Sequence, residues 1–267
     1  MNGTRIVAAL LCTLLLAGCA GMQSDPSAEA RQALAPSGKL RVALLDVNAV
    51  HVVKDAASGE MRGVAHDLGK ALAARLGVPF QPLIYPTIAG MLQAGKAAEW
   101  DVAFVGVTQE RRSFLDFTAN HLEVEYGYLV PLGSKISDIG EIDRAGMRLA
   151  VVEKGSPDFF LTRALKSATL VRTAAIRGAL DLLGTGKADA VAGLKPNMYA
   201  VSAKLPGSRV LEGRPGSEGA ALAMPKHRNP AALAYARRFI EEAKAGGLVK
   251  QAIERAGLRG AVVAPHE

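Results

Sequence analysis

The chain has 267 residues, of which 49% are hydrophobic and 21% are charged, and its formal net charge is +7. It is too apolar to be disordered and has enough apolar side chains for one large domain or two modest ones. Its basic residues are scattered among acids and form no aromatic-rich basic segment, so we expect no nucleic-acid partner.

Residues 1–18 have the pattern of a signal peptide, because Arg5 precedes an apolar stretch that is too short to span a bilayer comfortably. The small residues before Cys19 resemble the bacterial lipobox, which implies cleavage before Cys19 and its lipidation. An uncleaved membrane anchor is the alternative. The small and polar residues 19–37 are typical of a flexible tether. The mature domain would contain no disulfide and no cysteine nucleophile.

Strands alternate with amphipathic helices from residue 38 onward. In the first part of the chain, apolar runs predict strands at 39–45, 79–86 and 101–107. A helix over 64–76 is predicted between the first two, and a helix that Thr87 caps between the last two. This alternation is typical of βαβ units with a mainly parallel sheet.

The alternation repeats further along the chain, where strands are predicted at 147–152, 168–172 and 189–194. A helix capped by Ser156, with Pro157 at its first position, follows the first of these strands. The segments LQAGKAAEWDVAFV and LLGTGKADAVAG both run from a helix end through Gly-Lys-Ala to an aspartate that opens a strand. This echo favours two similar α/β lobes.

We expect the first lobe to comprise residues 38–127 and 222–260 and the second to comprise residues 128–221. Extended crossings are expected at 128–136 and 213–230. The second crossing would return the chain to the first lobe, where a helix that Asn229 caps follows. A cleft between two lobes is a default ligand site, and hinge closure is its usual motion.

Three blocks resemble family 3 of the bacterial solute-binding proteins, the receptors of polar amino acid-type ABC transporters. They are GEMRGVAHDLGKALAARLGVPF, LQAGKAAEWDVAFVGVTQERRSFLDFT and GMRLAVVEKGSPDFF, and the similarity covers residues 38–258. The resemblance implies a two-lobed type II periplasmic-binding-protein fold and an ABC permease as partner. Together with the lipobox at Cys19, it implies a protein that is lipid-anchored in the cell envelope and faces the periplasm or the outer surface of the plasma membrane. We expect a monomer.

The segment GVTQERRSFLDFT carries the expected ligand clamp. The Arg111 guanidinium offers a planar fork of donors that can hold a carboxylate by two parallel bonds. The resemblance implies that Thr108 and Gly106 lie on the same side of the ligand. Gly155 and Ser156, with the free N–H groups of a helix start, would face it from the other lobe. We expect Arg112 to be the solvated neighbour.

Two departures from the family pattern suggest what the solute is. Leu194 stands where amino acid receptors of this family commonly place an aspartate for the ligand's ammonium group, and Lys195 follows it. In the first loop, Asn48 and His51 are the polar candidates near the cleft. We therefore expect a small anionic solute, a carboxylate without an ammonium group.

Two other functions stay open. A cleft enzyme of the cyclohexadienyl dehydratase type would need an acid or base, for which Glu153 and His51 are candidates. A lipid-anchored binder can also present its ligand to a sensor. The histidine spacing predicts no metal site and there is no phosphate-binding loop, so we expect no cofactor. His121, Glu123 and Glu125 alternate on a strand, which is typical of a solvated face.

Overall fold

The computed structural model describes residues 25–46, 48–54 and 58–267, so the expected signal peptide and Cys19 lie outside the described residues. The helices are α1 (Ala28–Leu34), α2 (Val64–Leu76), α3 (Ile88–Lys96), α4 (Gln109–Arg112), α5 (Ser156–Ala164), α6 (Ile176–Gly184), α7 (Lys195–Ser202), α8 (Pro230–Ala245), α9 (Leu248–Arg255) and the 3-10 helix η1 (Ile139–Glu141). The strands are β1 (Leu40–Leu45), β2 (Val53–Lys54), β3 (Met61–Arg62), β4 (Phe80–Tyr85), β5 (Val102–Gly106), β6 (Leu115–Val130), β7 (Arg148–Val152), β8 (Thr169–Thr173), β9 (Ala190–Leu194), β10 (Arg209–Val210), β11 (Ser217–Pro225) and β12 (Ala261–Val263).

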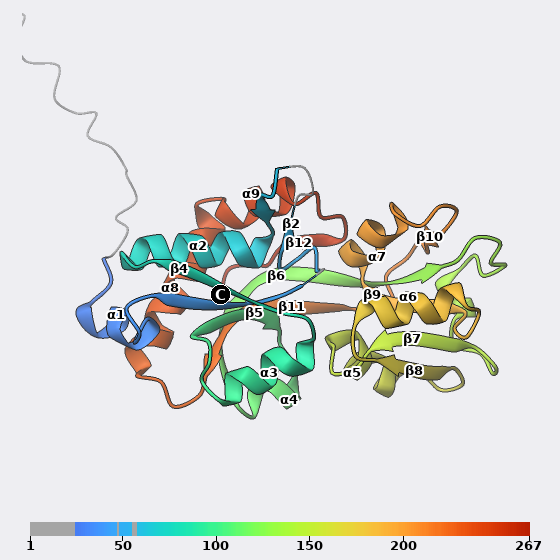
Figure 1. Cartoon of the computed structure of the whole chain (residues 1–267), viewed down its shortest axis with the longest axis horizontal. Coiled ribbons are helices and arrows are strands. Elements are labelled where there is room, and N and C mark those ends of the chain that lie inside the picture. The colour runs from blue at the N-terminus through green and yellow to red at the C-terminus, as the bar shows by residue number, and fades with distance from the viewer. Residues whose placement is uncertain (1–24, 47, 55–57) are drawn as a thin grey trace, which may run out of the picture.

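One mixed sheet runs through both halves of the molecule, in the order β4-β1-β5-β11-β6-β9-β7-β8 (Figure 1). β1 is parallel to β4 and β5, and β7 is parallel to β8 and β9. We call β1–β5, β11 and β12, with α1–α4, α8 and α9, lobe 1, and β7–β10 with α5–α7 lobe 2. The described residues thus form the expected two-lobed α/β fold.

The long strand β6 belongs to both lobes. It pairs with β11 up to Glu125 and with β9 from Tyr126 onward. The first crossing therefore lies inside β6, a few residues before the expected position at 128–136. Half of the expected return crossing at 213–230 is strand β11, which lies between β5 and β6 in the sheet of lobe 1.

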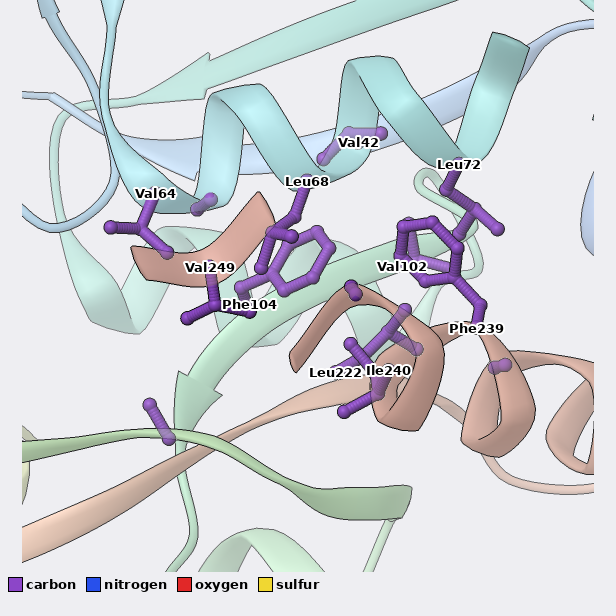
Figure 2. Close-up of a cluster of buried hydrophobic side chains, with 14 of the residues drawn as sticks. Val42, Val64, Leu68, Leu72, Val102, Phe104, Leu222, Phe239, Ile240 and Val249 are labelled. Atoms are coloured by element: carbon purple, nitrogen blue, oxygen red, sulfur yellow. The ribbon is translucent and has the colours of Figure 1, made fainter. Parts of the chain in front are cut away.

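Each lobe has buried apolar clusters on both faces of its sheet. In lobe 1, α2, α8 and α9 cover one face with the cluster shown in Figure 2, which includes Leu68, Phe104 and Phe239. α3 and Trp100 contribute to the cluster on the other face. In lobe 2, α5 packs in one cluster and α6 with α7 in the other. Two separately packed cores let the lobes keep their shape when the angle between them changes.

Local chemistry sets the ends of several helices. The Thr87 side chain accepts the N–H of Gly90 at the start of α3, and Asn229 accepts the N–H of Ala231 at the start of α8. α2 ends at Gly77, whose φ of 64° is in the left-handed region that glycine adopts without strain. The caps predicted at Thr87 and Asn229 are confirmed.

The expected flexible tether does not extend to residue 37. Residues 28–34 form α1, which packs against α8 and buries Ala30 and Leu34. Its contacts include Arg228 Nη1, which donates to Ala33 O at 3.0 Å, and Asn229, which donates to Glu29 at 2.7 Å. The small and polar composition of this segment concealed a short amphipathic helix.

The prediction of a solvated face at His121 is wrong. His121 is 1% exposed and stacks edge-on against Phe104, because α8 covers this part of β6. Within the described part of the chain, no helix has the length and apolar character needed to cross a membrane.

Candidate functional site

A cavity of about 390 Å³ lies between the two lobes. Its walls come from the carboxyl ends of β1 and β5 in lobe 1, and of β7 and β9 in lobe 2, together with the starts of α3, α5, α6 and α7. The carboxyl ends of parallel strands are the usual place for a ligand in such sheets. Of the site residues predicted from sequence, Asn48, Gly106, Arg111, Gly155 and Ser156 line this cavity, whereas Thr108 and Lys195 do not.

Arg111 is only 3% exposed and joins the two lobes. Its Nη1 donates to Gly106 O at 2.7 Å within lobe 1 and to Ser156 Oγ at 3.2 Å in lobe 2. Its Nη2 donates to Lys154 O at 3.0 Å, also in lobe 2. Among the described residues, the buried Nε has no hydrogen-bond partner. Arg111 therefore keeps one buried donor for which the described residues supply no partner.

Burial dominates the electrostatics of Arg111. It lowers the pKa of the guanidinium, and the negative charge of Glu218 acts in the opposite direction. An arginine stays protonated in proteins even so, which leaves a full positive charge at the cavity wall. Arg112, by contrast, is exposed, with its guanidinium 5.5 Å from the centre of the Phe117 ring and outside the cavity lining.

Thr108 and Gly106 support Arg111 in different ways. The Thr108 side chain accepts the N–H of Arg111 at 3.2 Å and caps the short helix α4. A Cβ added at Gly106 would lie 2.3 Å from Glu218 Oε2 and 2.5 Å from Ser156 Oγ, so a larger residue there would displace both side chains. Thr108 thus positions the clamp, and Gly106 makes room where the two lobes meet.

Ser156 is not the helix cap that its sequence position suggested. The cap is Gly155, which has no side-chain cap bond, and α5 begins at Ser156. The Ser156 hydroxyl is therefore available to accept the Arg111 bond described above. None of the described side chains caps the start of α5, α6 or α7, and all three starts line the cavity. Their free N–H groups therefore make its lobe 2 wall electropositive.

Glu218 is the functional candidate that sequence reasoning missed. It lines the cavity from β11, and the Tyr126 hydroxyl donates to its Oε2 at 3.4 Å. Burial raises the pKa of Glu218, while the charge of Arg111 and hydrogen bonds from Ser156 and Tyr126 lower it. The return crossing carried no sign of this role, because the position of Glu218 depends on how β11 pairs with β5.

The first loop contributes buried polar groups. Asn48 Oδ1 accepts the N–H of Val50 at 3.0 Å, so this side chain mainly holds the loop. His51 lines the cavity, where burial, and then the nearby charge of Arg111, lowers its pKa to about 4. Asn197, which was not predicted, lines the cavity from α7 and accepts the N–H of Ala49 at 2.9 Å across the lobes.

The two residues behind the anion prediction occupy different environments. Leu194 lines the cavity as expected. Lys195 does not, because its Nζ donates to Glu125 at 2.9 Å and to Gly213 O at 2.9 Å outside the cavity. Lys195 is therefore already neutralised, and the inference that it favours a second negative charge on the solute is wrong. Glu153, one of the two enzyme candidates, is also outside the lining.

Comparison with known proteins identifies the family of the chain. Residues 40–257 match the bacterial extracellular solute-binding proteins, family 3. The chain belongs to this family. No curated protein sequence matches this family 3 protein.

Solved structures share the fold of this family 3 protein at low sequence identity. An amino acid ABC transporter substrate-binding protein of Streptococcus pneumoniae bound to L-arginine is 23% identical, with a TM-score of 0.73 over 87% of this chain and 99% of its own. A solute receptor for L-cysteine of Neisseria gonorrhoeae is 23% identical, with a TM-score of 0.73 over 85% of this chain and 92% of its own. An ancestral amino acid-binding protein, a precursor of cyclohexadienyl dehydratase, is 23% identical, with a TM-score of 0.69 over 84% of this chain and 98% of its own.

Proposed function

We propose that this family 3 protein is the receptor of an ABC uptake system and that it captures a small solute through a carboxylate. Membership of the family supports the receptor role. The names of similar structures, an amino acid ABC transporter protein among them, support a permease as partner. The solute is bound in the cavity between the lobes, and binding favours the closed arrangement because only that arrangement presents groups from both lobes.

The observation that carries the carboxylate proposal is the donor set of Arg111. Arg111 lines the cavity, its Nε is buried without a partner among the described residues, and a buried donor left unsatisfied costs about 1–3 kcal/mol. A carboxylate oxygen would satisfy it with a charge-assisted bond. The uncapped start of α5 adds N–H donors from the opposite lobe.

The sequence-based preference for a solute without an ammonium group is not part of this proposal. It rested on an apolar residue at 194 and a free cation at 195. In the structure, Lys195 is paired with Glu125. The cavity is also lined by an acid, Glu218, that the sequence analysis did not identify.

We also propose that the protein is attached to the cell envelope by lipid at Cys19. This part depends on the resemblance of Leu16–Cys19 to a lipobox. The mass of the native N-terminus tests it, because an unmodified Met1 or Cys19 would rule out acylation.

The experiment that tests the carboxylate proposal is a thermal-shift screen of small carboxylic acids, amino acids included, against their primary amides. We expect at least one carboxylate to raise the melting temperature and its amide to have little effect, because the amide cannot form the charge-assisted bonds to Arg111. Stabilisation by acid and amide alike would contradict the carboxylate clamp.

A second measurement tests for enzyme activity. We expect the solute to be recovered unchanged after incubation with the protein, whereas its conversion to a product would favour the dehydratase-type alternative.

A further inference from the structure

We propose that the turn between α9 and β12 is a latch that favours the closed arrangement of the lobes from outside the cavity. This latch turn comprises residues 256–260. It contacts α7 of lobe 2 through Arg259, which lies over the Tyr199 ring, and through Gly260, which packs against Lys195. Arg259 and Tyr199 both lie outside the cavity lining, so the inference goes beyond the proposed binding of the solute itself.

The latch turn is fixed to lobe 1 at the point where β6 passes from one lobe to the other. β12 follows the turn directly and pairs with residues 122–124 of β6. Gly260 O accepts the N–H of Glu125 at 2.8 Å. Glu125 is the last residue of β6 that pairs with β11, and Tyr126 is the first that pairs with β9. The turn therefore reaches lobe 2 from the lobe 1 side of the first crossing.

The contact between Arg259 and Tyr199 joins the two lobes. The Arg259 guanidinium lies 3.6 Å from the centre of the Tyr199 ring. At this distance a cation is attracted to the face of an aromatic ring. The other cation–ring contacts among the described residues lie within lobe 1. The stacked pair therefore adds an attraction that depends on how the lobes are placed.

Gly260 allows the latch turn to lie close to the start of α7. A Cβ added at Gly260 would lie 3.0 Å from Lys195 Cδ and 3.1 Å from Lys195 Cβ. The Lys195 side chain is itself held, because its Nζ donates to Glu125 and to Gly213 O. Lys195 and Tyr199 are four residues apart in α7, so they share a face of the helix. The latch turn covers this face.

The same helix lines the cavity with other residues. Asn197 and Met198 belong to the lining, and Asn197 Oδ1 accepts the N–H of Ala49 of lobe 1 at 2.9 Å. A rotation of lobe 2 that separates Asn197 from Ala49 also moves Tyr199 relative to Arg259, because a helix moves as a rigid element. A contact that is made only in the closed arrangement favours that arrangement. The latch therefore supports closure without touching the solute.

The test uses variants of the purified protein that remove or keep the stacked pair. Arg259→Ala and Tyr199→Ala remove it, whereas Tyr199→Phe keeps the ring. Arg238→Ala is the matched control, because it removes an exposed arginine that lies over the Tyr235 ring within lobe 1. Circular dichroism and the melting temperature without solute establish that each variant is folded.

Two measurements together report closure. Hydrogen exchange at the Ala49 amide, followed by NMR without solute, reports the open fraction, because Asn197 holds this N–H in the closed arrangement. Calorimetric titration with the carboxylate that stabilises the wild type most in the thermal-shift screen reports an affinity that is proportional to the closed fraction of the free protein. The increase in exchange rate multiplied by the decrease in affinity gives the shift in the open–closed equilibrium, whatever the starting populations.

We expect this product to be about two to five for Arg259→Ala, the size of a cation–ring contact at an exposed site. Tyr199→Ala should give a similar product, and the double variant should give no more than either alone, since both changes remove the same contact. Tyr199→Phe and Arg238→Ala should leave both measurements as in the wild type. The amides of β5 should exchange at the wild-type rate in every variant, which separates opening from a general loss of stability.

Three results would overturn the latch. They are a folded Arg259→Ala protein in which neither measurement changes, equal effects of Arg259→Ala and Arg238→Ala, and a double variant in which the two single effects multiply. A wild type that binds no carboxylate would overturn the proposed function separately. The exchange rate then decides alone, and an unchanged rate at Ala49 in Arg259→Ala would overturn the latch.

Discussion

His121 is a buried histidine for which the described residues provide no hydrogen-bond partner at either ring nitrogen. Its ring lies edge-on to Phe104 with 5.4 Å between ring centres. Burial, helped by the nearby His51 and Lys244, lowers the pKa of His121 to about 3. His51, whose Nδ1 accepts the N–H of Leu45 at 3.3 Å, has its pKa lowered to about 4. Lobe 1 thus depends on two histidines that stay neutral.

Because of these two histidines, we expect the folded protein to lose stability in mild acid. In the unfolded chain a histidine takes up its proton near pH 6.5, whereas in the folded protein His121 does so only near pH 3. The free energy of unfolding is therefore expected to decrease as the pH falls below 6.5, by about 2–3 kcal/mol from His121 alone at pH 4.5. Urea unfolding at pH 7 and pH 4.5 measures this decrease.

The matched variants separate His121 from other causes of acid sensitivity. His121→Leu should lose about 2–3 kcal/mol less than the wild type between the two pH values, since the leucine has no proton to gain. His227→Asn changes an exposed histidine and should retain the wild-type pH dependence. An identical pH dependence in wild type and His121→Leu would show that His121 is not responsible.

At the level of single residues, sequence reasoning succeeded where a side chain's place follows from a strand end or a helix start. Gly106, Arg111 and Ser156 all line the cavity for this reason. Glu218 and Lys195 depend on contacts between segments far apart in the chain. Strand alternation alone could not show that Glu218 faces Gly106 or that Lys195 finds Glu125.

At the level of elements, the echo in the sequence corresponds to one bonding pattern used in both lobes. Asp101 accepts from the backbone N–H, Nε and Nη2 of Arg41, at 2.9, 3.1 and 2.8 Å. Asp189 accepts from the same three groups of Arg148, at 2.8, 3.1 and 2.8 Å. In lobe 1 the aspartate just before β5 therefore holds the start of β1. In lobe 2 the aspartate just before β9 holds the start of β7.

The two aspartates are expected to differ in their contribution to stability. The Asp101 side chain is fully buried and also accepts from Arg228, whereas the Asp189 side chain is 33% exposed. Asp101→Ala should lower the free energy of unfolding by about 2–4 kcal/mol, because the N–H of Arg41 and the partly buried guanidinium groups of Arg41 and Arg228 lose their partner. Asp189→Ala should lower it by about 1–2 kcal/mol because water replaces part of the interaction. Equal losses in urea unfolding would contradict the role of burial.

Element types were easier to predict than the connections between them. The six parallel strands and the helices that Thr87 and Asn229 cap follow from apolar runs and capping residues. The length of β6 could not be predicted in this way, because a strand with two sets of partners looks like two separate segments in the sequence. α1 was taken for a tether, since its burial comes from α8, far along the chain.

At the level of the whole molecule, the fold places the candidate cavity between two separately packed lobes. The lobes are joined through β6 and the segment that leads into β11. Their contacts include those of Arg111, Ala49 with Asn197, Glu110 with Arg163, and the Arg259 guanidinium, which lies 3.6 Å from the centre of the Tyr199 ring. The Glu110–Arg163 contact is exposed and 3.6 Å long, so it contributes little to closure. The buried contacts of Arg111 with both lobes link closure to the proposed solute.

The most direct measurement is a calorimetric titration of the wild type, Arg111→Ala and Arg112→Ala with the carboxylate that stabilises the wild type most in the screen. Arg111→Ala should weaken binding by at least about a hundredfold, since it removes a buried, charged hydrogen-bonding partner, while Arg112→Ala should change it by less than about threefold. Arg111→Lys, which keeps the charge but not the planar fork, should fall between them. A folded Arg111→Ala protein that binds this carboxylate as tightly as Arg112→Ala does would contradict the account.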